Sequence, residues 1–341
     1  MKVQLNDELV KSYKPVRAFT QSATEKAFVL PSPSISLDFE PTIGHFLIAN
    51  HGHINKLTLL NANSGEIIQR CSNVYSNTGA FITKFTKRHA ELLLAPYISE
   101  AQASGCEIQT YSLSQKSAIR SYFGHSKQVL SISQSPFDDG FASSDIGGEM
   151  RIWDPRNGHN PCIAVAPSNQ LTSQRCETFV TYHPSGSILA SADSISGKIR
   201  LYSIKNLQAG PFQILESWSN THSDEREIVD IKFSPDGSII LITTNQNSLI
   251  GIGTQEERVL YTCECVSTSS QPAVPAFSCD SKYFFVNGPS GPLIFSGMTG
   301  EFIHEIQSGN AIKVSQISCF SPKTELLVTS GEDAMVFWRL M

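Results

Sequence analysis

Apolar and polar residues alternate in short runs along most of this chain, and each run ends at a turn. Residues 228–233 alternate in this way, 234–237 contain the turn residues Pro235 and Gly237, and 238–244 form the next apolar run. A two-residue period bounded by Pro and Gly predicts β-strands joined by tight turns. No apolar run approaches the roughly 20 residues of a membrane-spanning helix, so we expect no membrane span.

One short pattern, an aromatic residue two positions before a proline, recurs at the turn that follows the first strand of each unit. The clearest copies are Tyr182-His183-Pro184, Phe233-Ser234-Pro235 and Phe320-Ser321-Pro322, and weaker variants end at residues 41, 87, 136 and 279. The copies are about 40–50 residues apart, which is the period of propeller blades. The seven copies therefore predict an all-β, seven-bladed β-propeller with about four strands in each blade.

A closed ring of repeats can use the whole chain, so we expect residues 1–341 to form a single unit. The last unit ends after its third strand, and we expect the apolar residues 16–19 to close the ring and remove an exposed sheet edge. Three stretches, at 21–34, 98–106 and 157–176, are longer than a minimal blade needs and predict long loops, where recognition tends to reside. The approximate boundaries are an N-terminal arm and closing strand at 1–20, and blades at 35–70, 79–120, 127–166, 177–216, 227–265, 272–307 and 312–341.

The third repeat carries a more specific mark. The pair Gly124-His125 precedes its first strand, and Trp153-Asp154 follows 28 residues after the histidine. Within this strand rhythm, that spacing is the mark of a WD-repeat blade. Tyr202 occupies the tryptophan position of the fourth repeat and Trp338 that of the seventh, whereas Trp218 has no assigned role.

In WD blades the histidine commonly joins a buried hydrogen-bond chain with a Ser or Thr, a turn Asp and the Trp. His125, Ser143 and Trp153 are present, but Gly147 stands where the turn Asp is expected. We therefore expect the chain of hydrogen bonds to be incomplete unless Asp145 reaches in. The role of His125 is expected to be structural, because a catalytic histidine needs a nucleophile and an orienting acid.

Charge and cysteine content narrow the class of protein. The net charge is −5, and no basic stripe suited to phosphate backbones is present, so we expect no direct nucleic-acid contact. We interpret Lys84, Lys87 and Arg88 as a solvated strand edge. Eight cysteines without a C-x-x-C pair, and an N-terminus without an apolar signal core, favour a reduced, intracellular protein.

Candidate catalytic and metal-binding patterns are weak. His51-x-His53 with His45, and Cys263-x-Cys265, each lack the third and fourth ligands of a metal site and are interpreted as strand, turn and core residues. Gly251 and Gly253 lie in a strand with no following helix to receive a phosphate. Nucleophile-elbow and Walker-type motifs do not occur. We therefore predict no enzyme activity, no catalytic residue, no cofactor and no metal.

The chain resembles one particular WD-repeat family. The resemblance is carried by residues 119–129, 135–139, 151–154, 210–212, 231–237, 241–245 and 334–338. The family is the propeller subunit shared by the COMPASS histone-lysine methyltransferase complex and by the cleavage-and-polyadenylation factor with its type-one protein phosphatase module. The longer 21–34 stretch and Gly147 depart from the family pattern and fit a fungal-type paralogue.

The resemblance implies a non-catalytic nuclear adaptor, monomeric within a hetero-complex. It would bind a short segment of the methyltransferase scaffold or of a phosphatase-targeting subunit, and so link chromatin regulation by histone methylation to mRNA 3′-end processing and transcription termination. A different class stays open: Trp153-Asp154-Pro155-Arg156 matches a form that some propellers use as substrate receptors of cullin-RING ubiquitin ligases.

On a propeller, the loops entering the innermost strand and the loops joining the second and third strands share one face. Because acidic residues outnumber basic ones there, we expect this face to receive an extended, Arg-bearing peptide through charge-assisted hydrogen bonds. Charge reversal at Asp145 and Glu332 is expected to weaken partner binding without lowering thermal stability. The candidate partner-binding residues are Lys127, Gln128, Asp145, Arg175, Glu177, Asp193, Asp224, Arg226, Glu227, Asn245, Glu332 and Asp333.

Overall fold

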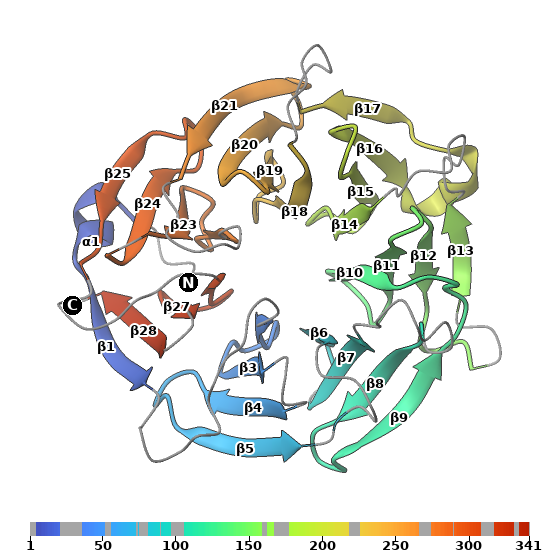
Figure 1. Ribbon diagram of the computed structural model, residues 1–341, viewed down its shortest axis with the longest axis horizontal. Coiled ribbons are helices and arrows are strands. Elements are labelled where there is room, and N and C mark those ends of the chain that lie inside the picture. The colour runs from blue at the N-terminus through green and yellow to red at the C-terminus, as the bar shows by residue number, and fades with distance from the viewer. Residues whose placement is uncertain are drawn as a thin grey trace.

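Seven four-stranded antiparallel sheets are arranged around a central axis in the computed structural model (Figure 1). This arrangement confirms the predicted seven-bladed propeller. In the described part of the chain, no helix is long and apolar enough to cross a membrane. The structure describes residues 5–20, 36–51, 56–72, 74, 81–88, 90–96, 106–158, 162–166, 177–217, 226–265, 274–288, 290–307, 317–330 and 334–340.

The blades are numbered here in chain order, and each is written from its innermost to its outermost strand. Blade one is β2 (Leu37–Phe39), β3 (Phe46–His51), β4 (Lys56–Asn61) and β5 (Ile67–Ser72). Blade two is β6 (Phe81–Phe85), β7 (Glu91–Pro96), β8 (Ile108–Ser112) and β9 (Ser117–Tyr122). Blade three is β10 (Val129–Gln134), β11 (Phe141–Asp145), β12 (Met150–Trp153) and β13 (Cys162–Ala166).

Blades four to seven repeat this order. Blade four is β14 (Thr178–Tyr182), β15 (Ile188–Asp193), β16 (Lys198–Ser203) and β17 (Gln213–Glu216). Blade five is β18 (Ile228–Phe233), β19 (Ile239–Thr244), β20 (Ser248–Gly253) and β21 (Arg258–Glu264). Blade six is β22 (Ala276–Phe277), β23 (Tyr283–Asn287), β24 (Pro292–Ser296) and β25 (Phe302–Glu305). Blade seven is β26 (Ile317–Phe320), β27 (Leu327–Ser330), β28 (Ala334–Leu340) and β1 (Tyr13–Thr20).

The N-terminal strand closes the ring, as the sequence predicted. β1 pairs antiparallel with β28, from Tyr13 opposite Leu340 to Thr20 opposite Ala334. In Figure 1 the blue β1 lies beside the red β28 at the junction of the first and last blades. The pairing satisfies the edge of β28, which would otherwise expose a row of unpaired backbone groups.

The hydrophobic core lies between neighbouring blades. Middle strands such as β19 are buried at every position, because both of their faces are covered by other blades. One cluster, for example, joins Ala190 and Leu201 of blade four to Ile228, Ile242 and Ile250 of blade five. The ring is therefore held together mainly by apolar contacts between blades.

Polar clasps between innermost strands reinforce this core. The Phe85 N–H donates to Asp38 Oδ2 over 2.7 Å, joining blade two to blade one. The Tyr182 N–H donates to Ser133 Oγ over 3.0 Å, joining blade four to blade three. Each bond satisfies a backbone donor on the side of the strand that faces the axis, which ladder pairing leaves free.

The N-terminal segment also docks on blade six, which the sequence did not predict. Leu5 and the helix α1 (Asp7–Lys11) bury Leu5 and Val10 in the cluster that contains Phe285 and Trp338. The Leu5 N–H donates to Asp280 Oδ2 over 2.8 Å, and the Tyr283 hydroxyl donates to Asp7 Oδ1 over 2.6 Å. The N-terminus therefore contributes packing as well as the closing strand.

Two further elements differ from the sequence prediction. Within the stretch 157–176, predicted as a long loop, residues Cys162–Ala166 form β13, the outer strand of blade three. A 3₁₀ helix, η2 (Ile204–Ala209), separates β16 from β17 and buries Leu207. The predicted loop at 21–34 and most of that at 98–106 lie outside the described residues.

Candidate functional site

In blades three, four and five, the connector that leads into the innermost strand lies beside the turn between the second and third strands of the same blade. The Ile146 N–H donates to the Gln128 carbonyl in blade three, the Ser194 N–H to the Glu177 carbonyl in blade four, and the Asn245 N–H to the Glu227 carbonyl in blade five. These three bonds, of 2.9–3.0 Å, place both loop types on one face of the ring. We call it the connector face, and the opposite face, which carries the aromatic-x-Pro turns, the turn face.

The predicted residues of the connector face fall into three groups. Lys127, Glu227 and Asn245 are exposed, and Gln128, Glu177 and Arg226 are partly exposed. Asp193 is 9% exposed; it accepts from the backbone N–H groups of Ile195 and Ser196 and lies 3.7 Å from Arg200 Nη1, so its carboxylate also stabilises its own turn. Asp145 is described below, and Arg175, Asp224, Glu332 and Asp333 lie outside the described residues.

A complete hydrogen-bond chain is buried beneath this face in blade three. The Trp153 Nε1–H donates to Ser143 Oγ over 2.8 Å, and Ser143 Oγ lies 2.6 Å from His125 Nε2. His125 Nδ1 lies 2.9 Å from Asp145 Oδ2. Because the carboxylate can only accept, Nδ1 carries the proton and Nε2 accepts from the serine hydroxyl. Asp145 therefore does reach in and replaces the acid missing at Gly147.

This position changes the interpretation of Asp145 as a partner-binding residue. The residue is 1% exposed, and its Oδ1 accepts from the N–H groups of Gly147 and Glu149. Its carboxylate thus cannot reach a partner on the surface. The expectation that reversing its charge would leave stability unchanged is not supported, because a lysine here would bury an unpaired cation.

His125, Asp145 and Glu149 bring three potential metal ligands within 4.8 Å of one another. Both ring nitrogens of His125 and both oxygens of Asp145 already make hydrogen bonds to protein groups. A metal ion would have to break the His125–Asp145 contact to bind. The cluster therefore fits a structural network better than a metal site.

Parts of the same network recur elsewhere. In blade seven the Trp338 Nε1–H donates to Thr329 Oγ1 over 2.8 Å. In blade four Tyr202 is buried opposite Leu189, as Trp153 is opposite Phe141 and Trp338 opposite Leu327. The three aromatic residues thus occupy equivalent positions, as the repeat predicted. Trp218 lies outside the described residues.

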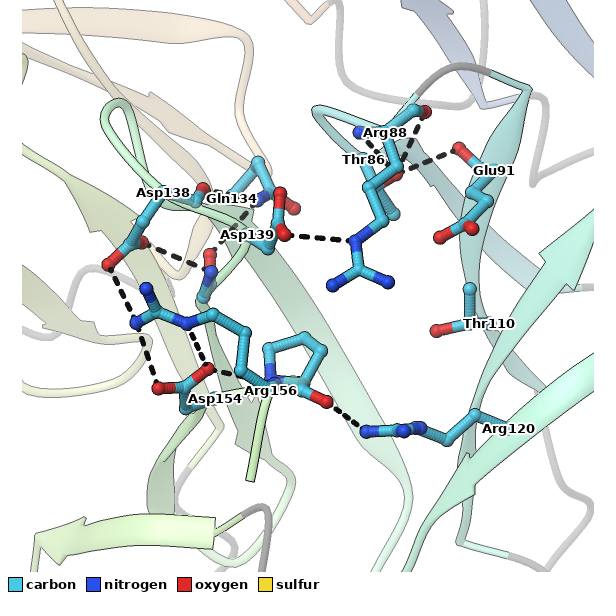
Figure 2. Close-up of polar contacts among 12 residues, drawn as sticks. Thr86, Arg88, Glu91, Thr110, Arg120, Gln134, Asp138, Asp139, Asp154 and Arg156 are labelled. Atoms are coloured by element: carbon cyan, nitrogen blue, oxygen red, sulfur yellow. Dashed lines mark hydrogen bonds and ion pairs between the residues drawn. The ribbon is translucent and has the colours of Figure 1, made fainter. Parts of the chain in front are cut away.

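The turn face carries paired charges between blades two and three (Figure 2). Arg88 Nε donates to Asp139 Oδ2 over 2.9 Å, and the Arg156 guanidinium donates to both oxygens of Asp154, each over 2.9 Å. Arg120 donates to the Pro155 carbonyl. The hydrogen bond from Arg156 holds the pKa of Asp154 below its usual value. Arg156, the last residue of the candidate cullin-adaptor motif, is thus engaged with its own turn.

The three basic residues near position 85 do not form a basic stripe. Lys84 lies on the innermost strand 3.5 Å from Asp38, Lys87 donates to the Pro136 carbonyl, and Arg88 pairs with Asp139. Lys84 is therefore part of the channel rather than of a solvated edge. The other two residues join neighbouring blades at the surface.

The cysteine pair of blade five is a core feature, as predicted. Cys263 and Cys265 belong to the apolar cluster that contains Phe284 and Phe295. Burial raises the pKa of Cys263 to about 11 and that of Cys265 to about 12, because a thiolate is poorly solvated there. Among the histidines considered for a metal, His53 lies outside the described residues, as does the side chain of His51.

Sequence reasoning missed two apolar side chains on the connector face. Phe123 is 72% exposed immediately after β9, and Ile195 is 50% exposed in the turn between β15 and β16. Large apolar groups next to polar rims are typical of protein interfaces. The only sequence signal was their position, directly beside Gly124-His125 and after Asp193.

Comparison with known proteins agrees with this geometry. Residues 116–154 match the family model described as "WD domain, G-beta repeat". The chain is 25% identical to WD repeat-containing protein 82 of Drosophila melanogaster over 340 residues, covering 99% of this chain and 98% of the relative. It is 22% identical to COMPASS component SWD2 of Saccharomyces cerevisiae over 97% of this chain and 96% of the relative.

A third relative, Set1 complex component swd2 of Schizosaccharomyces pombe, is 27% identical over 68% of this chain and 62% of its own. The matched repeat contains the His125–Asp145–Ser143–Trp153 network, and the two longer matches include all seven blades. The chain is therefore a WD-repeat β-propeller that is similar over nearly its whole length to WD repeat-containing protein 82 and SWD2.

Proposed function

We propose that this protein is a non-catalytic adaptor subunit of a nuclear, chromatin-associated complex of the COMPASS type. The observation that carries the proposal is similarity to a relative named as a COMPASS component over 97% of this chain, and to one named as a Set1 complex component over 68% of it. The His125–Asp145–Ser143–Trp153 network is used by structural hydrogen bonds, which suits a holding role rather than a reaction. Monomeric incorporation, one copy in each complex, is part of the proposal.

The connector face is the proposed partner site. Glu177 and Glu227 supply acid from neighbouring blades, and Phe123 and Ile195 add exposed apolar surface. This combination favours an extended segment with an arginine and an apolar side chain. A guanidinium matches a carboxylate in two hydrogen bonds, and the apolar groups supply the desolvated contact.

The scaffold of a histone-lysine methyltransferase is the first candidate owner of that segment. A phosphatase-targeting subunit of the cleavage-and-polyadenylation machinery is the second, and would connect the protein to mRNA 3′-end processing and transcription termination. Both candidates use the same face, so one propeller would hold one of them at a time. No direct contact with nucleic acid is proposed, because the basic residues near position 85 are already paired.

Affinity purification of the full chain from its native cells, followed by mass spectrometry, tests the proposal. We expect histone methyltransferase subunits among the specific partners. The double variant Glu177→Lys/Glu227→Lys should reduce their recovery about tenfold or more, which corresponds to roughly 1.4 kcal/mol. The matched control Asp138→Lys/Asp139→Lys reverses two charges on the turn face and should leave recovery unchanged. Recovery of no chromatin-modifying subunit with the wild type would refute the proposal.

The same purification tests the ubiquitin-ligase alternative. That function requires the cullin adaptor among the partners and its loss in Arg156→Ala. In the structure the Arg156 guanidinium is exposed but bound to Asp154 through two hydrogen bonds. Docking through Arg156 would have to share or break those bonds, so the geometry gives this alternative less support.

A further inference from the structure

A cavity of about 580 Å³ follows the axis of the ring and is lined by the innermost strands of all seven blades. The residue just before each aromatic anchor contributes one wall position in each blade. The seven wall positions are Asp38, Lys84, Ser133, Thr181, Lys232, Ala276 and Cys319. We call this set the channel ring.

Three channel-ring members make structural hydrogen bonds to neighbouring blades. Ser133 Oγ accepts from the Tyr182 N–H, and Lys232 Nζ donates to the Pro275 carbonyl over 2.7 Å. Asp38 Oδ2 accepts from the Phe85 N–H. The channel-ring side chains therefore join neighbouring blades, and each such contact uses only one polar atom of the side chain.

The charged side chains that line the cavity can make polar contacts beyond those that join blades. Lys84 Nζ meets Asp38 Oδ1 at 3.5 Å, and Lys232 Nζ meets Asp230 Oδ2 at 3.3 Å. Both distances are long for charge-assisted hydrogen bonds, which are usually about 2.7–2.9 Å. Asp230 Oδ2 is buried and receives no hydrogen bond. Within the described residues, the cavity thus offers an underused ammonium at Lys84 and an underused carboxylate at Asp230.

The Asp38, Lys84, Asp230 and Lys232 side chains line the same cavity although they come from blades one, two and five. The Asp38 and Asp230 carboxylates both raise the pKa of Lys84, with Asp38 the stronger, so the ammonium remains charged. Burial raises the pKa of Asp38, and the Lys84 and Lys232 ammonium groups partly oppose this rise. Burial raises the pKa of Cys319 to about 12, which keeps this thiol neutral. The cluster therefore contains two basic and two acidic side chains.

A ligand for such a site must carry both signs of charge. An anion alone would gain from Lys84 but meet Asp38 and Asp230, and a cation alone would meet both lysines. We propose that the central channel binds a small zwitterion, a free α-amino acid, with its carboxylate at Lys84 and its ammonium at Asp230. Phe85, Phe179 and Phe277, which line the same cavity, would receive an apolar side chain. The volume lies within the usual range of small-molecule sites.

Thermal unfolding of the full chain with each of the twenty free L-amino acids tests this. At ten times Kd, a bound amino acid should raise Tm by on the order of 2 °C, and the effect should saturate with concentration. Isothermal titration should then give the same Kd. A failure of every amino acid to stabilise the protein saturably would overturn the proposal.

Blocked forms of the best amino acid test the charge requirement in the wild-type protein. The N-acetyl form removes the ammonium and the amide form removes the carboxylate, and each should weaken binding at least tenfold. Lys84→Met and Asp230→Asn should have the same effect, whereas Lys198→Met, at a partly exposed position of β16 away from the cavity, should bind normally. Equal binding of the blocked forms would contradict the proposal even if the channel variants fold poorly. The outcome is independent of the partner purification, because the channel and the connector face are separate surfaces.

Discussion

At the scale of single residues, Asp145 completes the buried hydrogen-bond network although it does not lie at the sequence position expected for the turn aspartate. The sequence places glycine at the expected acid position, and Asp145 is two residues earlier. The turn of residues 145–148 folds back through the Gly148 N–H bond to the Asp145 carbonyl and directs the Asp145 side chain inward. Motif spacing alone could not show whether the Asp145 carboxylate reaches His125, because that depends on the conformation of the turn.

Removing this carboxylate should destabilise the protein. Asp145→Ala leaves the His125 ring N–H and two backbone N–H groups without acceptors in a buried site, at a cost of about 2–3 kcal/mol. Equilibrium urea unfolding measures the loss. Asp139→Ala, which removes only the surface ion pair with Arg88, should change stability by less than about 1 kcal/mol. Equal midpoints for wild type and Asp145→Ala would contradict the account.

The buried thiols predict an alkaline loss of stability. Burial raises the pKa of Cys263 to about 11 and that of Cys265 to about 12 in the folded protein, against an ordinary thiol value of 9.0. Above pH 9 the unfolded chain therefore releases protons that the folded chain retains, so stability falls as pH rises towards 11. Urea unfolding at pH 8 and pH 10.5 should show this fall, and Cys263→Ala/Cys265→Ala should make it smaller. The same slope in both proteins would exclude the thiols as its cause.

At the scale of elements, the turn chemistry made most strands predictable. The aromatic-x-Pro turn fixes the end of the innermost strand, and alternation identifies the next two. Outer strands were harder, because β13 is a five-residue run in a Pro-, Asn- and Ser-rich stretch and is defined by its pairing with β12. The helix α1 was missed because five residues give little local signal, and docking on blade six stabilises them.

The docked N-terminus gives a matched pair of variants within ten residues. Leu5 is 1% exposed against Tyr283 and Phe285, whereas Leu9 is 39% exposed. Leu5→Ala should lower the free energy of unfolding by about 2–4 kcal/mol through lost burial and a cavity. Leu9→Ala should lower it by about 0.5 kcal/mol or less. Similar values for the two variants would mean that the segment does not dock as described.

Contacts between neighbouring turns give a second prediction at this scale. Gly186 has φ +66°, and a Cβ at this residue would lie 2.4 Å from Phe137 Cδ2 of the adjacent blade. Gly186→Ala should therefore destabilise by about 1–3 kcal/mol, through both the strained backbone and the clash. Adding Phe137→Ala should recover part of the loss, the part caused by the clash. Gly158→Ala, where a Cβ meets no atom within 4 Å, is the control.

At the scale of the whole molecule, the closed ring was predictable from the repeat and from the short final blade, which required a strand from elsewhere. The channel cluster was not predictable, because Asp38 and Lys84 are 46 residues apart in the sequence and come together only when neighbouring blades pack around the axis. The assignment of each loop to one of the two faces was predictable, because successive loops of a propeller blade lie on opposite faces of the ring. The exposure of individual side chains on these faces was not predictable. Asp145 was expected to contact a partner but is buried, whereas Phe123 was not expected to do so and is exposed.

The claim that a partner is held on the connector face is tested most directly by hydrogen–deuterium exchange of the purified native complex against the free chain. We expect slower exchange around residues 126–128, 145–148, 193–196 and 245–247 in the complex, with little change in the turns at 135–140 and 234–238. Protection confined to the turn face, or exchange that is the same in the free and bound chain, would contradict it.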